Sequence, residues 1–417
     1  MSIQTKNTTQ MYTNSGDTTT SASFYVFLIL TIFIIGRPQD IFLFLQPLRL
    51  GLVLGIINVI LVFTQNINPI SIILRDSIGK KYLYFYGIMV LGIPFAIYRK
   101  VAFDYVIFQY SLNVLYFGLF LLHINSYKRM RTQALTIVCS ICFYGLVSLH
   151  FGIGGGGRFS FGSMYDPNDL AYLLVSFVSF TAFFFTGKGT VATKLLAVFT
   201  AGISMVVIVK TGSRGGLIAL VVLLLLFLFT KLNPTKRPIK LVFLIGIMVF
   251  VVVNKDMIFT ERNKSILNPS QDYNVTSDTG RIEIWEKGLE FTFKKPLTGV
   301  GAWCFPEAIG TDRKERGVAQ RWQAVHNSYI QISSELGLIA FIIFMLMMKD
   351  TVQILRKVRK GDGDQMIISD EQKLAGIVQI GFISHCTAAF FLTQGYSMLF
   401  TLFFAFAAAM NKTFNHE

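Results

Sequence analysis

The class of fold is decided by residues 191–230, which run VATKLLAVFTAGISMVVIVKTGSRGGLIALVVLLLLFLFT. Two apolar runs, 191–209 and 215–230, flank a short polar turn that is rich in glycine. About 20 apolar residues in an α-helix cross roughly 30 Å of hydrocarbon. The stretch therefore predicts two neighbouring transmembrane helices joined by a turn at one membrane surface.

Similar apolar runs recur along the whole chain. Hydrophobic residues make up 53% of the 417 residues and charged residues only 15%, and the mean hydropathy is +0.55. A soluble protein carries roughly a quarter charged residues. We therefore predict an all-α integral membrane protein with about twelve spans, at approximately 24–36, 48–64, 82–98, 103–122, 134–151, 168–186, 191–209, 215–230, 238–253, 328–348, 374–393 and 396–411.

The spans divide the chain into five parts. We expect a disordered cytoplasmic tail at 1–23, which is rich in Thr, Ser and Asn and lacks the apolar core of a signal peptide. Transmembrane helices one to nine follow at 24–253, and a long polar loop occupies 254–327. Helices ten to twelve lie at 328–411, before a short cytoplasmic tail at 412–417.

Basic residues in the short loops predict the orientation, because Lys and Arg accumulate in cytoplasmic loops. With the N-terminus inside, the inner loops carry most of these residues. The short outer loops carry only Arg37, Arg49, Arg99, Lys100, Arg158, Lys210 and Arg214. We therefore predict both termini in the cytoplasm and the long loop outside. That loop mixes about eleven Lys and Arg with about ten Asp and Glu, and long loops do not follow the bias.

Charge and cysteine content exclude several other classes. The net charge of +15 does not indicate nucleic-acid binding, because the basic residues are spread over short loops. Cys139 and Cys142 lie in an apolar run, which favours helix packing over redox or metal chemistry. No His, Cys or acidic cluster has metal-ligand spacing, and the acidic turn at 361–364 lies in a basic inner loop. We predict no metal and no cofactor.

The long loop contains a predicted amphipathic helix at 281–293. Ile282, Trp285, Leu289 and Phe293 fall on one face at helical spacing, while charged residues lie mostly on the other side. We expect this helix to lie on the outer membrane surface or to cap the bundle. An ordinary half-buried helix is the alternative.

Polar side chains at the outer ends of spans are candidates for function, because they are costly at membrane depth. In the first group, Lys210, Ser213 and Arg214 surround a glycine-rich turn that opens a helix, and backbone N–H groups there can bind an anion. The alternative is a tight turn with an Arg that extends to the membrane surface.

In the second group, Arg281 begins the amphipathic helix, where a cation opposes the helix dipole. Anion binding would explain why a cation occurs at this position. The alternative is an Arg that is simply solvated at the protein surface.

Two further groups lie where the chain meets the membrane. His326, next to the helix-capping candidates Asn327 and Ser328, can accept a proton near neutral pH, although a lone His is more often structural. In the other group, which follows Arg158, Asp166 is a helix cap, Pro167 the first helical residue and Asp169 lies in the first turn. Their place at the start of a helix is a structural explanation for these residues. The functional alternative is that they bind a sugar or a lipid phosphate.

Several of these segments occur in an order that resembles a known family: 166–171, 211–216, Arg281 with Trp285, 296–301, 326–329 and 335–337. Their order, and the long loop between spans nine and ten, are similar to the bacterial O-antigen ligase and O-antigen polymerase family of membrane glycosyltransferases. The resemblance covers most of the chain from about residue 150 onward. The charged residues 306–323 match none of the family segments. Trp303 has two interpretations, sugar stacking or the membrane interface, and the second is favoured.

The resemblance implies a GT-C-type fold in the bacterial inner membrane, surrounded by membrane lipid. It implies a glycan donor on undecaprenyl diphosphate, presented at the periplasmic face, and transfer without metal or nucleotide. The acceptor would be lipid A–core for a ligase or another lipid-linked repeat unit for a polymerase, and a chain-length regulator is a further expected partner. The motifs do not separate the two activities, or transfer to protein, and on general grounds we favour polymerase.

The resemblance also assigns roles. Arg214 and Arg281 would bind the diphosphate, where negative charge develops in the transition state and a guanidinium offers a bidentate fork. His326 would be the general base or would orient the acceptor. Further substrate contacts are expected from Lys210, Ser213, Arg158, Asp166, Asp169 and Asn327.

A transporter or lipid-linked oligosaccharide flippase is the alternative class. Twelve spans with both ends inside suit it equally well. Against it, we expect no internal repeat of the two halves and no ionisable residue in the middle of a span.

Overall fold

The computed structural model describes residues 20–64, 69–155, 158–162, 166–229, 237–258, 270, 272, 277, 280–317, 322–361 and 368–414. The first half forms helices and short helical turns: α1 (Ser21–Ile35), η1 (Pro38–Asp40), η2 (Leu43–Leu45), α2 (Leu50–Phe63), α3 (Pro69–Arg75), α4 (Ser77–Gly92), η3 (Ile93–Phe95), α5 (Arg99–Phe103), η4 (Asp104–Tyr110), α6 (Ser111–His123), α7 (Tyr127–Phe151), α8 (Pro167–Phe177), α9 (Ser179–Thr186) and α10 (Val191–Lys210). The second half adds α11 (Arg214–Phe229), α12 (Arg237–Val253), α13 (Lys255–Ile258), α16 (Arg281–Lys294), α17 (Phe305–Glu315), α18 (Ser328–Lys360), α19 (Asp370–Ala389) and α20 (Met398–Phe414).

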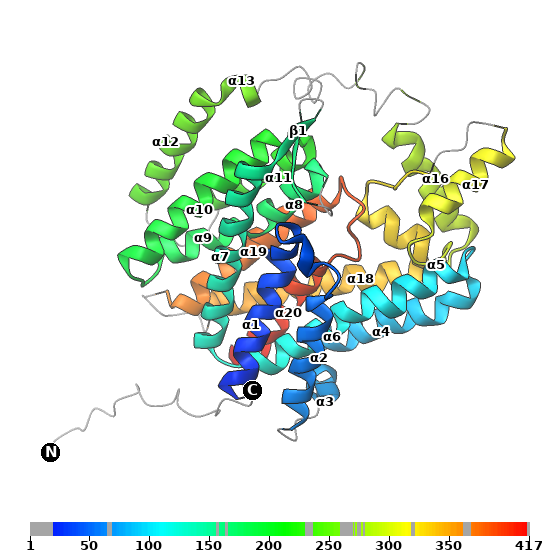
Figure 1. Ribbon diagram of the computed structural model, residues 1–417, viewed down its shortest axis with the longest axis horizontal. Helices are drawn as coiled ribbons and strands as arrows, with labels where there is room; N and C mark the ends of the chain where they lie inside the picture. Colours follow the sequence, from blue (N-terminus) through cyan, green and yellow to red (C-terminus); the bar gives the residue numbers. More distant parts are fainter. Residues whose placement is uncertain are drawn as a thin grey trace.

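Each predicted span contains a helix in this structure (Figure 1). Within the described residues, five segments are long and apolar enough to cross a membrane: Arg99–His123, Tyr127–Phe151, Pro167–Thr186, Val191–Lys210 and Ser328–Lys360. Five shorter apolar helices accompany them, at Ser21–Ile35, Leu50–Phe63, Arg214–Phe229, Phe243–Val253 and Met398–Phe414. The protein is therefore a multi-pass, helical membrane protein, and the count of twelve spans stays a prediction.

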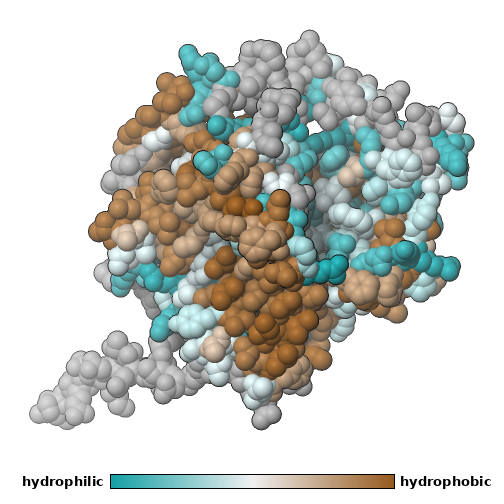
Figure 2. All heavy atoms as spheres, in the orientation of Figure 1, coloured by the Kyte–Doolittle hydropathy of each residue, from teal (hydrophilic) through white to brown (hydrophobic). Residues whose placement is uncertain are grey.

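Outward-facing helices expose apolar side chains, as helices in contact with lipid do. Figure 2 shows a broad hydrophobic surface over α1 and α2. Exposed apolar side chains include Ile56, Ile60 and Phe63 on α2, and Met248 and Val252 on α12. A soluble protein rarely exposes contiguous apolar patches of this kind, so the membrane surrounds these faces.

The centre of the bundle is formed by α20 and α18. All residues from Leu399 to Met410 of α20 are buried. Helix α18 packs against α4, α16, α19 and α20. It therefore connects the bundle to residues 280–317, which contain α16 and α17 and are called the outer segment below. Its path is interrupted at Gly337, where φ is +84° and ψ is 178°.

Two expectations about the chain's organisation need correction. The predicted tail 1–23 is too long, because α1 already begins at Ser21 and Ser23 is buried; residues 1–19 lie outside the described part. The predicted tail 412–417 is also too long, since α20 continues to Phe414. The structure is consistent with the predicted all-α class, and it adds one short hairpin in which β1 (Ile153–Gly155) pairs antiparallel with β2 (Arg158–Ser160). A run rich in glycine favours such a tight hairpin over a helix.

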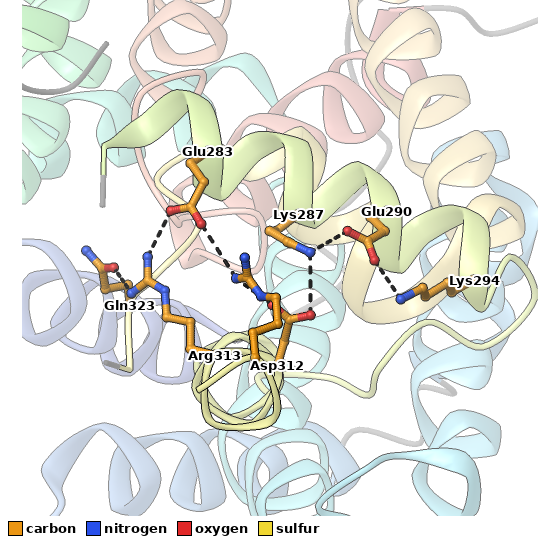
Figure 3. A network of polar contacts seen from close by, with 8 residues as sticks. Glu283, Lys287, Glu290, Lys294, Asp312, Arg313 and Gln323 are labelled. Atoms are coloured by element: carbon orange, nitrogen blue, oxygen red, sulfur yellow. Dashed lines mark hydrogen bonds and ion pairs between the residues drawn. The ribbon is translucent and has the colours of Figure 1, made fainter. Parts of the chain in front are cut away.

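The long loop contains the predicted amphipathic helix as α16, and a second helix, α17, that the sequence analysis did not predict. Figure 3 shows a charged network between them. Arg313 of α17 is buried and donates to Glu283 at 3.0 Å, while Lys287 pairs with Asp312 at 3.5 Å. The described residues 306–317, which matched no motif, thus lie mostly in α17 and pack against α16.

The two helices also share an apolar contact with α18. Gly288 lies against Ile330, so that an added Cβ would come within 2.4 Å of its side chain. Phe291 packs on Phe305 with ring centroids 5.8 Å apart. The predicted apolar face is a different one: Ile282, Leu289 and Phe293 remain exposed. The helix thus buries one side in protein and presents a separate apolar stripe outward.

Candidate functional site

The glycine-rich turn at 211–216 forms the N-terminus of α11, as predicted. The hydroxyl of Ser213 accepts the N–H of Gly216 at 3.2 Å, which is the geometry of a helix cap. Added Cβ atoms would meet Phe391 within 2.7 Å at Gly215, and Ala171 within 2.6 Å at Gly216. Glycine is needed at both positions because α8 and the segment after α19 approach the helix start so closely.

Arg214 and Arg281, which are 67 positions apart in sequence, line one small pocket. Asn168, Ser213, Phe391 and Leu392 complete its wall, together with the two glycines of α11. Each arginine is the first residue of its helix. The pocket thus combines two guanidinium groups with the N-terminus of a 16-residue helix, an arrangement that binds anions.

Arg214 already contacts a carboxylate. It forms a two-pronged ion pair with Asp272, whose second contact, from Nη2 to Oδ1, is 3.3 Å long. Both side chains are largely buried. A carboxylate in bidentate contact with Arg has the geometry that a phosphate would adopt. Asp272 therefore occupies the position of an anionic ligand, and the sequence analysis did not single it out.

His326 lies beside this pocket, at the point where the chain enters α18. Its backbone has φ of +51°, an uncommon value for a residue other than glycine. Its N–H donates to the hydroxyl of Thr393 at 2.8 Å. Burial and the positive charge of Arg281 lower the pKa of His326 to about 4, against the opposing charge of Asp166. The imidazole is therefore neutral at pH 7 and able to accept a proton.

Asp166 is the N-cap of α8, as predicted. Its carboxylate accepts the N–H groups of Asn168 at 2.6 Å and Asp169 at 3.0 Å. Asp169 in turn accepts a hydrogen bond from the amide of Gln394 at 2.8 Å. Arg158 donates to Asn168, a residue of the pocket wall, at 2.7 Å. These residues thus adjoin the pocket through its wall.

The two remaining predicted residues have structural contacts. The ammonium group of Lys210 lies 5.6 Å from the ring centroid of Phe159, beside the β-hairpin. Asn327 is 2% exposed, and its side chain accepts the N–H groups of Tyr329 and Ile330 as the cap of α18. Both contacts position secondary structure around the pocket, and the proposed substrate roles of both residues stay predictions.

The segment 390–397, between α19 and α20, is part of the site and was missed. Phe391 and Leu392 line the pocket, Thr393 holds the backbone of His326, and Gln394 holds Asp169. The signal was the polar run Thr393-Gln394-Gly395 between two apolar stretches, which the sequence analysis treated as the boundary of adjoining spans. Only the packing shows that this connection faces the pocket.

A buried carboxylate on α18 holds the outer segment. Glu335 is 1% exposed and accepts the backbone N–H groups of Trp303 at 2.9 Å and Phe305 at 3.1 Å. Nearby, the carbonyl of Glu335 accepts the N–H of Gly301 at 2.9 Å. In the sequence, Glu335 stands out only as part of the segment 335–337. In the structure, its carboxylate reaches from α18 to the backbone at the start of α17.

One expectation about the spans is wrong. We expected no ionisable residue in the middle of a span, but His385 lies within α19 and is fully buried. Its ring nitrogens contact the hydroxyls of Tyr172 at 3.1 Å and Ser176 at 2.9 Å. A neutral imidazole whose two nitrogens are both hydrogen-bonded is tolerated at this depth.

Among the described residues, no group of three or more His, Cys, Asp or Glu side chains is arranged to hold a metal ion. The cysteines in the same residues are free thiols. The positive charge of the pocket comes from its arginines and the α11 terminus.

These features define a helical membrane protein with a cationic pocket at the junction of its bundle and its outer helices. Residues 196–345 match the family model described as O-Antigen ligase. The match confirms the resemblance to the O-antigen ligase and polymerase family, and its range includes Arg214, Arg281 and His326. No curated protein matches the chain. The match covers 150 of the 417 residues, so it shows similarity to this family over that segment.

Proposed function

We propose that the protein transfers a glycan from an undecaprenyl-diphosphate carrier to a sugar hydroxyl at the periplasmic face of the inner membrane. The observation that carries the proposal is the pocket, in which Arg214 and Arg281 meet the N-terminus of α11 beside a neutral His326. The family supports the lipid-linked substrates, and the pocket supports an anionic group on the donor.

In the proposed reaction, the acceptor hydroxyl oxygen attacks the anomeric carbon of the glycan's reducing end. The bond between that carbon and the diphosphate oxygen breaks, and undecaprenyl diphosphate leaves. Arg214, Arg281 and the α11 terminus stabilise the negative charge that develops on the leaving group. His326 removes the hydroxyl proton or fixes the position of that hydroxyl. Asp272 would leave Arg214 when the donor binds.

The test is transfer by the purified protein in lipid nanodiscs, with lipid-diphosphate-linked glycan as donor and no ion gradient. We expect Arg214→Ala, Arg281→Ala and His326→Ala each to lower kcat/KM by about 100-fold or more. Arg316→Ala is the matched control, because this arginine is 40% exposed and pairs with Glu283 and Asp312 on the outer helices. Full activity of the Arg214 and His326 variants at normal expression would refute the mechanism.

The products in a deletion strain distinguish polymerase from ligase. Loss of long glycan chains, with a single unit still attached to lipid A–core, indicates the polymerase that we favour. Accumulation of lipid-linked polymer with bare core indicates the ligase. A protein that moves lipid-linked glycan across the membrane without joining it to an acceptor would be a transporter.

A further inference from the structure

Trp303 forms a flat aromatic pair with Tyr105 at the outer side of the bundle. The ring centroids are 4.6 Å apart and the two planes differ by 1°. Tyr105 is 9% exposed and belongs to η4, a turn of π-helix, whereas Trp303 is 42% exposed. One face of the indole is therefore covered by the tyrosine, and the tryptophan remains open to an incoming molecule. Single π-helical turns are often found at functional sites.

The loop that carries Trp303 is fixed on two sides. On one side, the N–H of Trp303 donates to the buried Glu335 of α18. On the other, the carbonyl of Val300 accepts the N–H of Ile97 at 2.9 Å, and a Cβ at Gly301 would come within 2.3 Å of Ala96. Trp303 itself has φ of +60°, an unfavourable conformation for this residue. The surrounding contacts thus hold an exposed indole in one orientation.

The pair is continuous with the candidate site. Tyr105 lies 5.6 Å, between ring centroids, from Tyr396 in the segment 390–397. The same segment holds His326 through Thr393 and Asp169 through Gln394. Its backbone is also tied to α18, where Gln331 accepts the N–H of Gly395 at 2.9 Å. Three residues of extended chain span at most about 11 Å, so Tyr396 lies no further than that from Thr393, and the aromatic pair adjoins the segment that lines the pocket.

We propose that Trp303, stacked on Tyr105, is a binding platform for a pyranose ring of the glycan substrate. The apolar C–H face of a sugar packs on an aromatic face, and a fixed, pre-stacked indole binds it with little loss of conformational freedom. A tryptophan that only anchors the protein at the lipid interface needs no strained backbone and no covered face. This inference rests on the proposed function, and donor and acceptor glycans share the chemistry it requires.

The first experiment measures binding without transfer. The probe is the oligosaccharide repeat unit of the source strain, released from its lipid carrier by mild acid, added to the protein in nanodiscs. Tryptophan fluorescence is recorded for the wild type and for Trp303→Phe, so that their difference isolates one of the three tryptophans in the chain. The matched control is Trp322→Phe, because Trp322 is 62% exposed and packs on Gly310 of α17.

We expect the free glycan to quench the Trp303 signal, and Trp303→Ala to weaken glycan binding by about tenfold. Trp303→Phe should bind with intermediate affinity, and Trp322→Phe should bind as the wild type does. Thermal melts identify variants that fail to fold. If Trp303→Ala fails to fold, the affinity of Trp303→Phe alone decides whether Trp303 binds the glycan. Equal binding by the wild type and Trp303→Phe, or no binding of the free glycan by the wild type, overturns the proposal.

Two further arms separate the alternatives. In nanodiscs of brominated phospholipid, quenching of Trp303 by the lipid but not by glycan would show an interface residue and would overturn the platform. In transfer assays, Trp303→Ala should raise KM for either the donor or the acceptor and leave kcat within about threefold, which identifies the glycan it binds. If the Arg214 and His326 predictions fail, glycan binding by Trp303 can still be measured. The proposed transfer mechanism and the proposed binding platform can therefore be refuted independently.

Discussion

At the scale of single residues, the site depends on unfavourable local features that neighbours compensate. Arg214 and Arg281 are cations at helix N-termini, where the backbone already presents positive partial charge. Asp272 neutralises the first of them. The neutral state of His326 follows from its burial near Arg281. The two arginines are therefore placed to bind a negatively charged partner, and the neutral imidazole is placed to accept a proton.

His326 makes a prediction about pH. A base must be unprotonated, and its pKa of about 4 means that activity stays level as pH falls from 8 to about 5 and declines below about 4. Asp166→Asn removes a charge that raises this pKa, so the decline should move to lower pH. The measurement is kcat/KM against pH in nanodiscs. A midpoint near 6.5, the ordinary value for His, would contradict the buried, neutral imidazole.

Asp272 makes a prediction about donor affinity. Since its carboxylate contacts Arg214, Asp272→Asn should lower KM for the lipid-diphosphate donor by roughly threefold to tenfold and leave kcat nearly unchanged. Initial rates at varied donor concentration measure both. The control is Glu290→Gln, which removes a carboxylate that pairs with Lys287 and Lys294 instead. A higher KM in Asp272→Asn would show that Asp272 orients Arg214 rather than competing with the donor.

At the scale of elements, the outer segment is attached to α18 at the point where that helix is interrupted. The carbonyl of Pro296 accepts the N–H of Leu338 at 2.7 Å, and that of Ser334 accepts the N–H of Val300 at 2.9 Å. Backbone groups released by the kink at Gly337 thus bond to the loop. The same loop carries Trp303, so the kink positions the platform as well as α17.

Gly337 should therefore be sensitive to substitution. Its φ of +84° disfavours any side chain, and an added Cβ would come within 2.6 Å of the carbonyl oxygen of Pro296. We expect Gly337→Ala to lower stability by about 2–4 kcal/mol. The matched control is Gly87→Ala in α4, where no atom lies within 4 Å of the added carbon. Thermal unfolding in detergent tests both, and equal melting temperatures would argue against the strained junction.

At the scale of the whole molecule, the polar candidates gather at one end. In Figure 1 strand β1, α16 and α17 lie in the upper part of the view, whereas α3 lies at the bottom. Figure 2 shows hydrophilic surface near α16 and α17 and hydrophobic surface over the helices below. This polarity suits a reaction at one membrane surface, and which surface that is stays a prediction.

Topology reporters test that orientation. Green fluorescent protein fused after Glu417 should fluoresce, because the C-terminus is predicted in the cytoplasm, and alkaline phosphatase inserted after Gly317 should be active, because α17 is predicted outside. Phosphatase inserted after Gly361, on the predicted inner side, is the control and should be inactive. The reverse pattern would place the cationic pocket on the cytoplasmic face.

The sequence by itself determined the helical membrane class and the positions of the apolar helices in the described part of the chain, because both follow from hydropathy. Local charge and a family pattern also led to Arg214, Arg281 and His326 as the proposed site residues. Helix α17, the β-hairpin, Asp272 and the segment 390–397 were decided by tertiary structure. They have little local signal: α17 is stabilised by Arg313 and Glu283 across helices, and Thr393 and Gln394 matter only through partners more than 60 positions away. Contacts between distant segments, which no local pattern encodes, bring the arginines into one pocket and stack Trp303 on Tyr105.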